Sequence, residues 1–206
     1  MADDTIVIFT SDHGMQLGSH GLMYKNVPWE ESMSIPFLIR WPGHIQAAAD
    51  NEVLLSSVDF APTLLGLAGL SEAIPDEMQG DDLSSELRGR SARAYPSAVY
   101  YGPPGPNGRP GMRGLRTREH KLIAGPEDGV AATSAAVLSV ELYDLVEDPY
   151  ELHNIAATSS ALAHDLGMRL ARKLADIGDP WLCKERLAAH LREHVAGRPS
   201  AQGSPP

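Results

Sequence analysis

The chain has 206 residues, 43% of them hydrophobic, which is enough to bury a core of ordinary size. Its formal net charge of -10 at pH 7 argues against binding to nucleic acid or to an anionic membrane, because both favour clustered lysine and arginine. A single cysteine excludes an internal disulfide framework.

The N-terminal residues begin acidic and then turn apolar. Asp3 and Asp4 precede a run rich in β-branched residues at positions 6–9. Such a short, uninterrupted run predicts a strand buried on both faces, as in a parallel sheet flanked by helices. It is too short to cross a bilayer and its acidic start does not fit a secretory signal, so we expect no membrane partner and a cytoplasmic location for the chain as it stands. At about 3.3 Å per residue the strand keeps Asp3 and Asp4 far from its C-terminal end, and we expect them to be solvated.

A loop with several glycines, residues 10–25, follows this strand and carries Asp12, His13 and Lys25. In open α/β sheets, ligands bind beyond the carboxyl ends of the strands, where Asp12 and His13 would stand. A carboxylate oxygen and an imidazole nitrogen on such a loop can converge on one divalent cation. Calcium takes about six to eight oxygens and zinc about four donors, so further ligands would come from elsewhere. A solvated Asp-His-Gly turn and a solvated lysine remain open interpretations of these residues taken alone.

The next predicted elements are a strand and a helix. Residues 36–41 predict a second strand, which a Pro-Gly pair ends. Residues 58–68 predict a helix that stops at Gly69. One face of this helix is expected to be formed by Val58, Ala61, Leu65 and Ala68. Residues 77–93 are polar and predict a loop.

The chain then alternates between short strands and turns before it becomes helical. Turn signals separate four short segments that predict a small antiparallel sheet: residues 98–101, 114–117, 121–124 and 141–143. Residues 102–111 are dense in glycine and proline and predict a loop. A leucine at every fourth position predicts an amphipathic helix over residues 159–177.

A second C-terminal helix is predicted over residues 180–195. It carries His190 and His194 on one face, but a solvated pair is favoured over a metal site, because neither an intervening glutamate nor a third ligand accompanies them. Cys183 is expected to pack within this helix. Residues 197–206, rich in Gly, Pro and Ser, are expected to be disordered.

The loop TSDHGMQLGSHGLMYK resembles that of the type I sulfatases of the alkaline phosphatase superfamily. In that family a strand ends in Ser-Asp-His-Gly or Ser-Asp-Asn-Gly, and a lysine follows one loop later. Four later blocks continue the resemblance in the family's order: IPFLIRWPG, SSVDFAPTLLGLAGL, RGLRTREHKLI and ELYDLVEDPYELHNIA. Together they span most of residues 5–156, and this collinearity is far more specific than any single motif.

The resemblance implies roles for three residues. Asp12 and His13 match the family's metal ligands, and Lys25 matches the catalytic lysine that binds the oxygens of the sulfate group. A cation and a fixed ammonium group would offset the charge that develops on a sulfate ester during cleavage. Calcium is the divalent metal implied, although imidazole nitrogen is less typical of calcium than an amide oxygen is. His20, on the same loop, is left outside this core site.

The family's nucleophile motif is missing from the 206 residues. Family members carry Cys-x-Pro-x-Arg or Ser-x-Pro-x-Arg, whose first residue is oxidised to formylglycine, and neither pattern occurs here. The resemblance therefore covers the family's last third or so, and we expect the C-terminal portion of a sulfuric ester hydrolase that is inactive alone. A fragment, a split gene, a frameshift or an incomplete gene model would each produce such a sequence.

The resemblance also implies the fold and the partners. We expect an α/β fold, with part of an alkaline-phosphatase-like sheet and flanking helices in residues 1–90. A subdomain with a small antiparallel sheet packed on a helix follows in residues 91–196. The expected substrate is a sulfate ester of a small molecule or a glycan. Two alternatives stay open: a phosphonate monoester or phosphodiester hydrolase of the same superfamily, and a noncatalytic module that pairs with a separately encoded N-terminal half.

Overall fold

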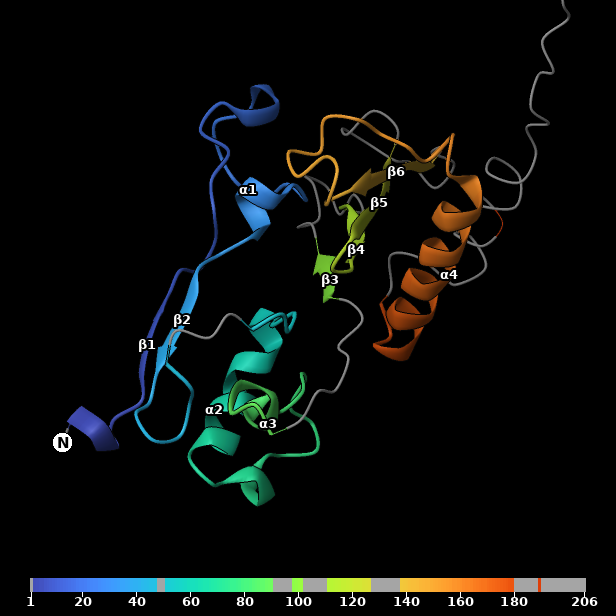
Figure 1. The fold of residues 1–206 in the computed structure, drawn as a ribbon. Helices are drawn as coiled ribbons and strands as arrows, with labels where there is room; N and C mark the ends of the chain where they lie inside the picture. Colours follow the sequence, from blue (N-terminus) through green and yellow to red (C-terminus); the bar gives the residue numbers. More distant parts are fainter. Residues whose placement is uncertain are drawn as a thin grey trace, which may run out of the picture.

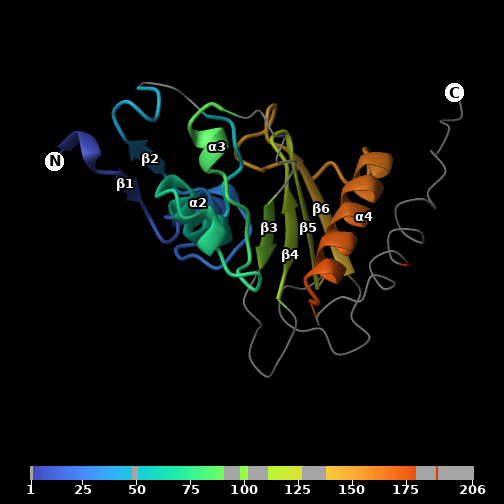
Figure 2. The same ribbon diagram turned by 90° about the horizontal axis from the view of Figure 1, so that it is seen from below.

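The computed structural model describes residues 2–47, 51–90, 98–101, 111–126, 138–179 and 189. Within these residues the strands form two separate antiparallel sheets, one with the order β1-β2 and one with the order β3-β4-β5-β6. Figures 1 and 2 show the long helix α4 on one side of the four-stranded sheet and the N-terminal part of the chain on the other side.

Strands β1 (Val7–Thr10) and β2 (Phe37–Arg40) confirm the first two predicted strands. They pair antiparallel, with Val7 opposite Arg40 and Thr10 opposite Phe37. The expected burial of the first strand in a parallel sheet is wrong for the described chain, because Phe9 is 63% exposed and β2 is the only strand that pairs with β1 there. One face of this small sheet, with Val7, Phe9 and Leu38, therefore presents apolar side chains to solvent.

The region around Ser56 forms a short 3-10 turn, η3 (Ser57–Asp59), that continues into helix α2 (Phe60–Leu67). Asp59 closes a capping box, since its Oδ2 accepts a hydrogen bond of 2.8 Å from the backbone N–H of Ser56. Gly69, at a φ of 77°, follows the helix end. The predicted helix and its stop are confirmed.

The buried face of α2 differs from the predicted one. The helix buries Pro62, Thr63, Gly66 and Leu67, whereas Val58, Ala61 and Ala68 are exposed. The reason is the segment that packs on it: Thr63 Oγ1 accepts a hydrogen bond of 3.0 Å from the N–H of Leu83. A short 3-10 turn, η4 (Ser71–Ala73), and a helical turn, α3 (Ser84–Leu87), also occur, the latter within the stretch that was predicted to be loop.

The four-stranded sheet is a simple meander. It contains β3 (Ala98–Tyr101), β4 (Arg113–Arg116), β5 (His120–Pro126) and β6 (Leu138–Asp144), each antiparallel to the next. The predicted strands and their antiparallel arrangement are confirmed. Leu122 of β5 lies opposite both Leu115 and Leu142, so one row of leucines crosses three strands.

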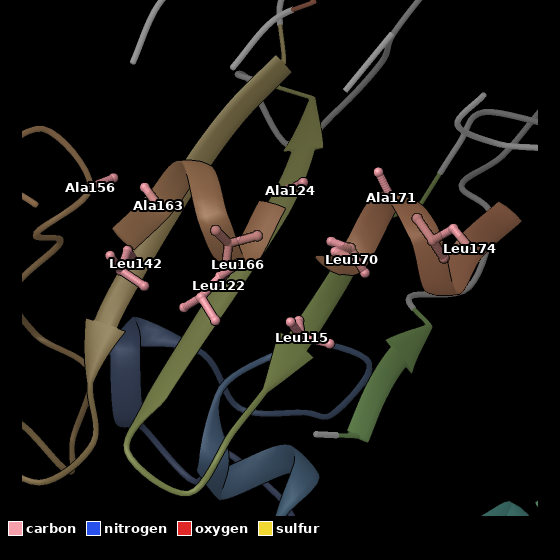
Figure 3. Packing of buried hydrophobic residues seen from close by; sticks show 10 residues of the cluster. All are labelled: Leu115, Leu122, Ala124, Leu142, Ala156, Ala163, Leu166, Leu170, Ala171 and Leu174. Carbon is pink, nitrogen blue, oxygen red and sulfur yellow. The ribbon is translucent and has the colours of Figure 1, made fainter. Parts of the chain in front are cut away.

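Helix α4 (Ser160–Asp176) confirms the predicted C-terminal amphipathic helix and covers this leucine row. Figure 3 shows its apolar face directed at the strands. The cluster of buried side chains comprises Leu115, Leu122, Ala124, Leu142, Ala156, Ala163, Leu166, Leu170, Ala171 and Leu174. Burying one such leucine stabilises the fold by roughly 1.5–3 kcal/mol, so this cluster is the main core of the described chain.

Several predictions fall on parts of the chain outside the described residues. These are the glycine- and proline-rich loop over residues 102–110, the histidine pair and cysteine of the second C-terminal helix, and the tail. Asp3 and Asp4 lie in an exposed 3-10 turn, η1 (Ala2–Asp4), as expected for solvated carboxylates. Among the helices of the described residues, none has the length and apolar character that a membrane span requires.

Candidate functional site

The three predicted site residues meet in the loop that follows β1. The carboxylate Oδ2 of Asp12 lies 3.3 Å from Nε2 of His13, and the Lys25 ammonium contacts the same Nε2. The Asp12 side chain is 82% exposed and that of His13 is 30% exposed. Two residues next to each other in sequence and a lysine 12 positions later thus form one accessible polar cluster.

The hydrogen bonds of His13 define which ring nitrogen can bind a cation. Its Nδ1 lies 2.7 Å from the carbonyl oxygen of Gly14, and a carbonyl oxygen can only accept, so Nδ1 carries the proton. In the neutral ring Nε2 then holds the lone pair, directed toward Asp12 and Lys25. Donation from one ring nitrogen to a backbone carbonyl is the usual arrangement of a metal-binding histidine, whose other nitrogen is the ligand. Here the Lys25 ammonium contacts that other nitrogen.

The surroundings of Asp12 favour its ionised form. Desolvation raises its pKa, but the charge of His13, backbone hydrogen bonds from Asp12 and His13, and the charge of Lys25 together lower the pKa by more. The backbone N–H of His13 donates to Asp12 Oδ1 at 3.0 Å. Ser11 Oγ lies 3.4 Å from the same oxygen. The site therefore presents a carboxylate beside an imidazole lone pair.

Helix α1 (Glu30–Met33) packs against the loop at Gly14. The N–H of Gly14 donates to the carbonyl oxygen of Ser32 at 2.9 Å. A Cβ atom at Gly14 would lie 2.1 Å from the carbonyl oxygen of Glu31, so only glycine allows this approach. The sequence shows that a glycine follows His13, but it does not reveal which element packs against it.

Backbone hydrogen bonds across the loop bring Lys25 back to His13. The N–H of Gln16 donates to the Tyr24 carbonyl at 3.0 Å, and the N–H of Gly18 donates to the Leu22 carbonyl at 2.7 Å. Gly18 has a φ of 108°, a conformation that side chains rarely adopt, and a short 3-10 turn, η2 (Ser19–Gly21), follows it. The loop thus doubles back on itself, which places the lysine next to the imidazole.

His20 points into a different environment. Its ring stacks on Trp29 with centroids 4.4 Å apart, and its Nε2 lies 3.8 Å from a carboxylate oxygen of Glu31. Gln16, on the same loop, is buried. Neither its side-chain nitrogen nor its side-chain oxygen has a hydrogen-bond partner within the described residues. The contacts of His20 are consistent with its exclusion from the core site.

The pair of Asp12 and His13 fits a divalent cation as two of its ligands and no more. In the described part of the chain, no group of three or more His, Cys, Asp or Glu side chains could hold a metal ion. Calcium would need about four to six further oxygens and zinc about two further donors. The two side chains therefore have the chemistry of metal ligands, but they do not complete a site.

The chain is similar to known sulfatases in sequence. The family described as "N-sulphoglucosamine sulphohydrolase, C-terminal" matches residues 18–178. The endo-4-O-sulfatase of Bacteroides thetaiotaomicron is 33% identical over 201 residues, which cover 91% of this chain and 39% of that protein.

Solved structures agree with these sequence matches. A putative sulfatase from Bacteroides fragilis superimposes with a TM-score of 0.78 and 33% identity, covering 92% of this chain and 38% of that one. The phosphonate monoester hydrolase of Agrobacterium radiobacter gives a TM-score of 0.63 and 28% identity, covering 87% of this chain and 36% of that one. The chain thus spans about two fifths of the length of these relatives, and the resemblance to sulfatases and the α/β fold class are confirmed.

Proposed function

Since the chain belongs to the N-sulphoglucosamine sulphohydrolase C-terminal family, we propose that it forms the C-terminal portion of a sulfuric ester hydrolase. The observation that carries this proposal is the meeting of Asp12, His13 and Lys25 after β1, in a chain whose matches include sulfatases. The substrate would be a sulfate ester of a small molecule or a glycan. The division into residues 1–90 and 91–196 remains part of the same proposal.

Asp12 and His13 would hold a divalent cation, with calcium as the metal we propose. The ionised carboxylate and the Nε2 lone pair are its two donors from this chain. When bound, such a cation would act as a Lewis acid that offsets negative charge on the sulfate oxygens. The hydrogen bond from Nδ1 to Gly14 keeps the ring in the tautomer that this role needs.

Lys25 would bind the oxyanion directly. Its ammonium group has three donors and no acceptor, and charge-assisted hydrogen bonds to anionic oxygens are among the stronger ones in proteins. Its contact with His13 Nε2, which a bound cation would replace, places the ammonium where the two proposed metal ligands meet. Lys25 would stabilise the charge that grows on the sulfate group as the ester bond breaks.

The nucleophile would come from outside the 206 residues, which contain neither Cys-x-Pro-x-Arg nor Ser-x-Pro-x-Arg. The exposed apolar side chains of the β1–β2 sheet support this, because Phe9 and Leu38 offer a surface on which further strands or helices could pack. A preceding segment or a separately encoded N-terminal half would fill that place. Without it we expect the chain to be a noncatalytic module.

A phosphonate or phosphodiester hydrolase is the second candidate, and the structural match to the phosphonate monoester hydrolase supports it. Sulfate and phosphonate are both tetrahedral oxyanions, and an ammonium group binds either one. The three residues of the site therefore do not favour one over the other.

Titration with anions tests both candidates. The side-chain NMR signals of Lys25 are followed as inorganic sulfate or methylphosphonate is added, with and without Ca²⁺. We expect saturable shifts at Lys25 that strengthen when Ca²⁺ is present, disappear in Asp12→Asn, and do not occur at the control residue Lys173 on α4. Tighter binding of sulfate supports the sulfatase, and tighter binding of methylphosphonate supports the second candidate. Equal shifts at Lys25 and Lys173 would contradict both.

A further inference from the structure

A buried ionic cluster lies on the face of the four-stranded sheet that is opposite α4. Lys121 of β5 is 4% exposed, and its ammonium lies 2.7 Å from Glu30 Oε1 and 2.8 Å from Glu151 Oε1. The same ammonium donates to the carbonyl oxygen of Pro28 at 2.8 Å. The Glu151 side chain is 0% exposed. Its second oxygen, Oε2, accepts a hydrogen bond of 2.6 Å from the backbone N–H of Glu30.

The alternation of side chains along β5 explains why a lysine is buried there. Leu122 points toward α4, so its neighbour Lys121 points to the other face of the sheet. On that face it meets the segment that leads from the candidate site into α1. Glu151, in the turn after β6, closes the cluster from the other side with a φ of 54°.

The electrostatics of the cluster are tightly coupled. Burial raises the pKa of Glu30, but Lys121 and Arg116 lower it by more, so the net pKa is lowered. Burial also raises the pKa of Glu151, and the charge of Glu30 adds to this, while Lys121 opposes it. Replacing a buried ion pair by apolar side chains is often neutral or stabilising, so what such a cluster contributes is a defined geometry more than stability.

This geometry reaches the candidate site through α1. The cluster holds the backbone at Pro28 and at the first residue of α1. The carbonyl groups of Glu31 and Ser32 in α1 then contact Gly14, which follows His13 directly. Lys25 lies just before the fixed segment. Both halves of the His13–Lys25 contact are thus connected to residues that the cluster holds.

We propose that Lys121, Glu151 and Glu30 are positioning residues that hold α1 against Gly14 and so keep His13 and Lys25 side by side. The inference rests on the proposed function for its significance, because it assigns the buried cluster to the alignment of that same site. It means that the C-terminal sheet, acting through α1, fixes the distance between a proposed metal ligand and the proposed anion-binding lysine.

Amide hydrogen exchange and the NMR chemical shifts of the His13 ring at one fixed pH test this in the full chain. In Lys121→Met we expect exchange of the Gly14 and Gln16 amides to accelerate about tenfold relative to the Leu142 amide in the sheet, because α1 is released locally. We also expect the His13 ring signals to move, because the surroundings of the ring change. Lys121→Arg keeps a buried cation and should restore part of both effects.

Asp179→Asn is the matched control. It weakens another buried ion pair of the same subdomain, in which Arg113 Nε lies 2.8 Å from Asp179 Oδ2, at the end of α4. We expect this variant to leave Gly14 exchange, relative to Leu142, and the His13 ring chemical shifts unchanged. An equal response in both variants would mean that general loosening of the subdomain explains the effect, which would overturn the proposal.

Two further results are decisive. A folded Lys121→Met chain with wild-type Gly14 exchange and wild-type His13 ring chemical shifts contradicts the proposal. If Lys121→Met does not fold, Glu30→Gln replaces it, because that variant keeps the N–H donor to Glu151 and removes one charge. It should still accelerate Gly14 exchange severalfold, and no change would contradict the proposal. Neither readout needs a metal or an anion, so failure of Ca²⁺ or sulfate to bind would count against the proposed function alone.

Discussion

Gly14 packs directly on the carbonyl oxygen of Glu31, so closely that a Cβ atom added at Gly14 would lie 2.1 Å from that oxygen. This contact joins the loop that carries Asp12 and His13 to helix α1. Because the obstacle is backbone, a side chain cannot be accommodated by a change of rotamer. The loop and the helix would have to separate.

Gly14→Ala is therefore expected to displace the site loop and to destabilise the chain by about 1–3 kcal/mol, the usual cost of overpacking. Urea unfolding measures the free energy, and the His13 ring signals report the displacement. Gly21→Ala is the control on the same loop, since nothing lies within 4 Å of its added Cβ atom. At the φ of 70° of this position an alanine costs roughly 1–2 kcal/mol, and no displacement of His13 should follow. Equal His13 shifts in both variants would contradict the packing account.

The pH dependence of stability should reflect Glu30. Its pKa is lowered in the folded chain from the ordinary value of 4.5, because Lys121 and Arg116 outweigh the opposing effect of burial. The stabilisation is therefore complete above about pH 4.5 and is lost as the pH falls through the lowered folded-state pKa. We expect Glu30→Gln to flatten the acid limb of a plot of urea midpoint against pH from 3 to 7. Glu147→Gln, which neutralises an exposed carboxylate, should leave the slope unchanged. A slope unaffected by Glu30→Gln would show that the ion pair with Lys121 does not form.

The exposed sheet β1–β2 should make the isolated chain associate with itself. Phe9 and Leu38 are 63% and 64% exposed and belong to a two-stranded sheet with unpaired edges in the described chain. We expect sedimentation velocity to show concentration-dependent oligomers that diminish in the double variant Phe9→Ser, Leu38→Ser. Leu152→Ser, which changes an exposed leucine away from this sheet, is the control. A monomer at all concentrations would argue that this surface needs no covering segment.

Much of the fold was predictable because the signals are local. The leucine period of α4 and the alternation of strands with turns in the C-terminal half depend on neighbouring residues only. The buried face of α2 was not predictable, because it depends on the segment around Leu83, which packs on the helix from elsewhere in the chain. The exposure of β1 was missed for a related reason: an apolar run indicates burial without saying whether covering elements are present.

For the candidate site, too, one part was predictable from the sequence and another was not. Asp12, His13 and Lys25 stand in a recognisable order on one loop, and the structure brings them together. The cluster of Lys121, Glu30 and Glu151 carries no such signal. Glu30 and Glu151 are 121 positions apart, and a lysine in an apolar strand reads as a solvated residue until its partners are known.

The isolated chain should not hydrolyse sulfate esters. The proposed ligands and lysine are present, but no residue of the 206 stands in the nucleophile motif. With 4-nitrophenyl sulfate and Ca²⁺ we expect release of 4-nitrophenolate to equal that of the Asp12→Ala variant. Hydrolysis at an enzyme-like rate that Asp12→Ala abolishes would show that the chain completes its own site.

Binding of Mn²⁺ to Asp12 and His13, followed by paramagnetic broadening of NMR signals, tests the central claim most directly. Asp148 and His153 provide an internal control, because this second pair places a carboxylate oxygen 3.4 Å from an imidazole nitrogen. We predict that substoichiometric Mn²⁺ broadens the His13 and Gly14 signals before those of His153, and that Asp12→Asn removes the preference while Asp148→Asn does not. Equal broadening at His13 and His153, unaffected by Asp12→Asn, would contradict the assignment of Asp12 and His13 as metal ligands.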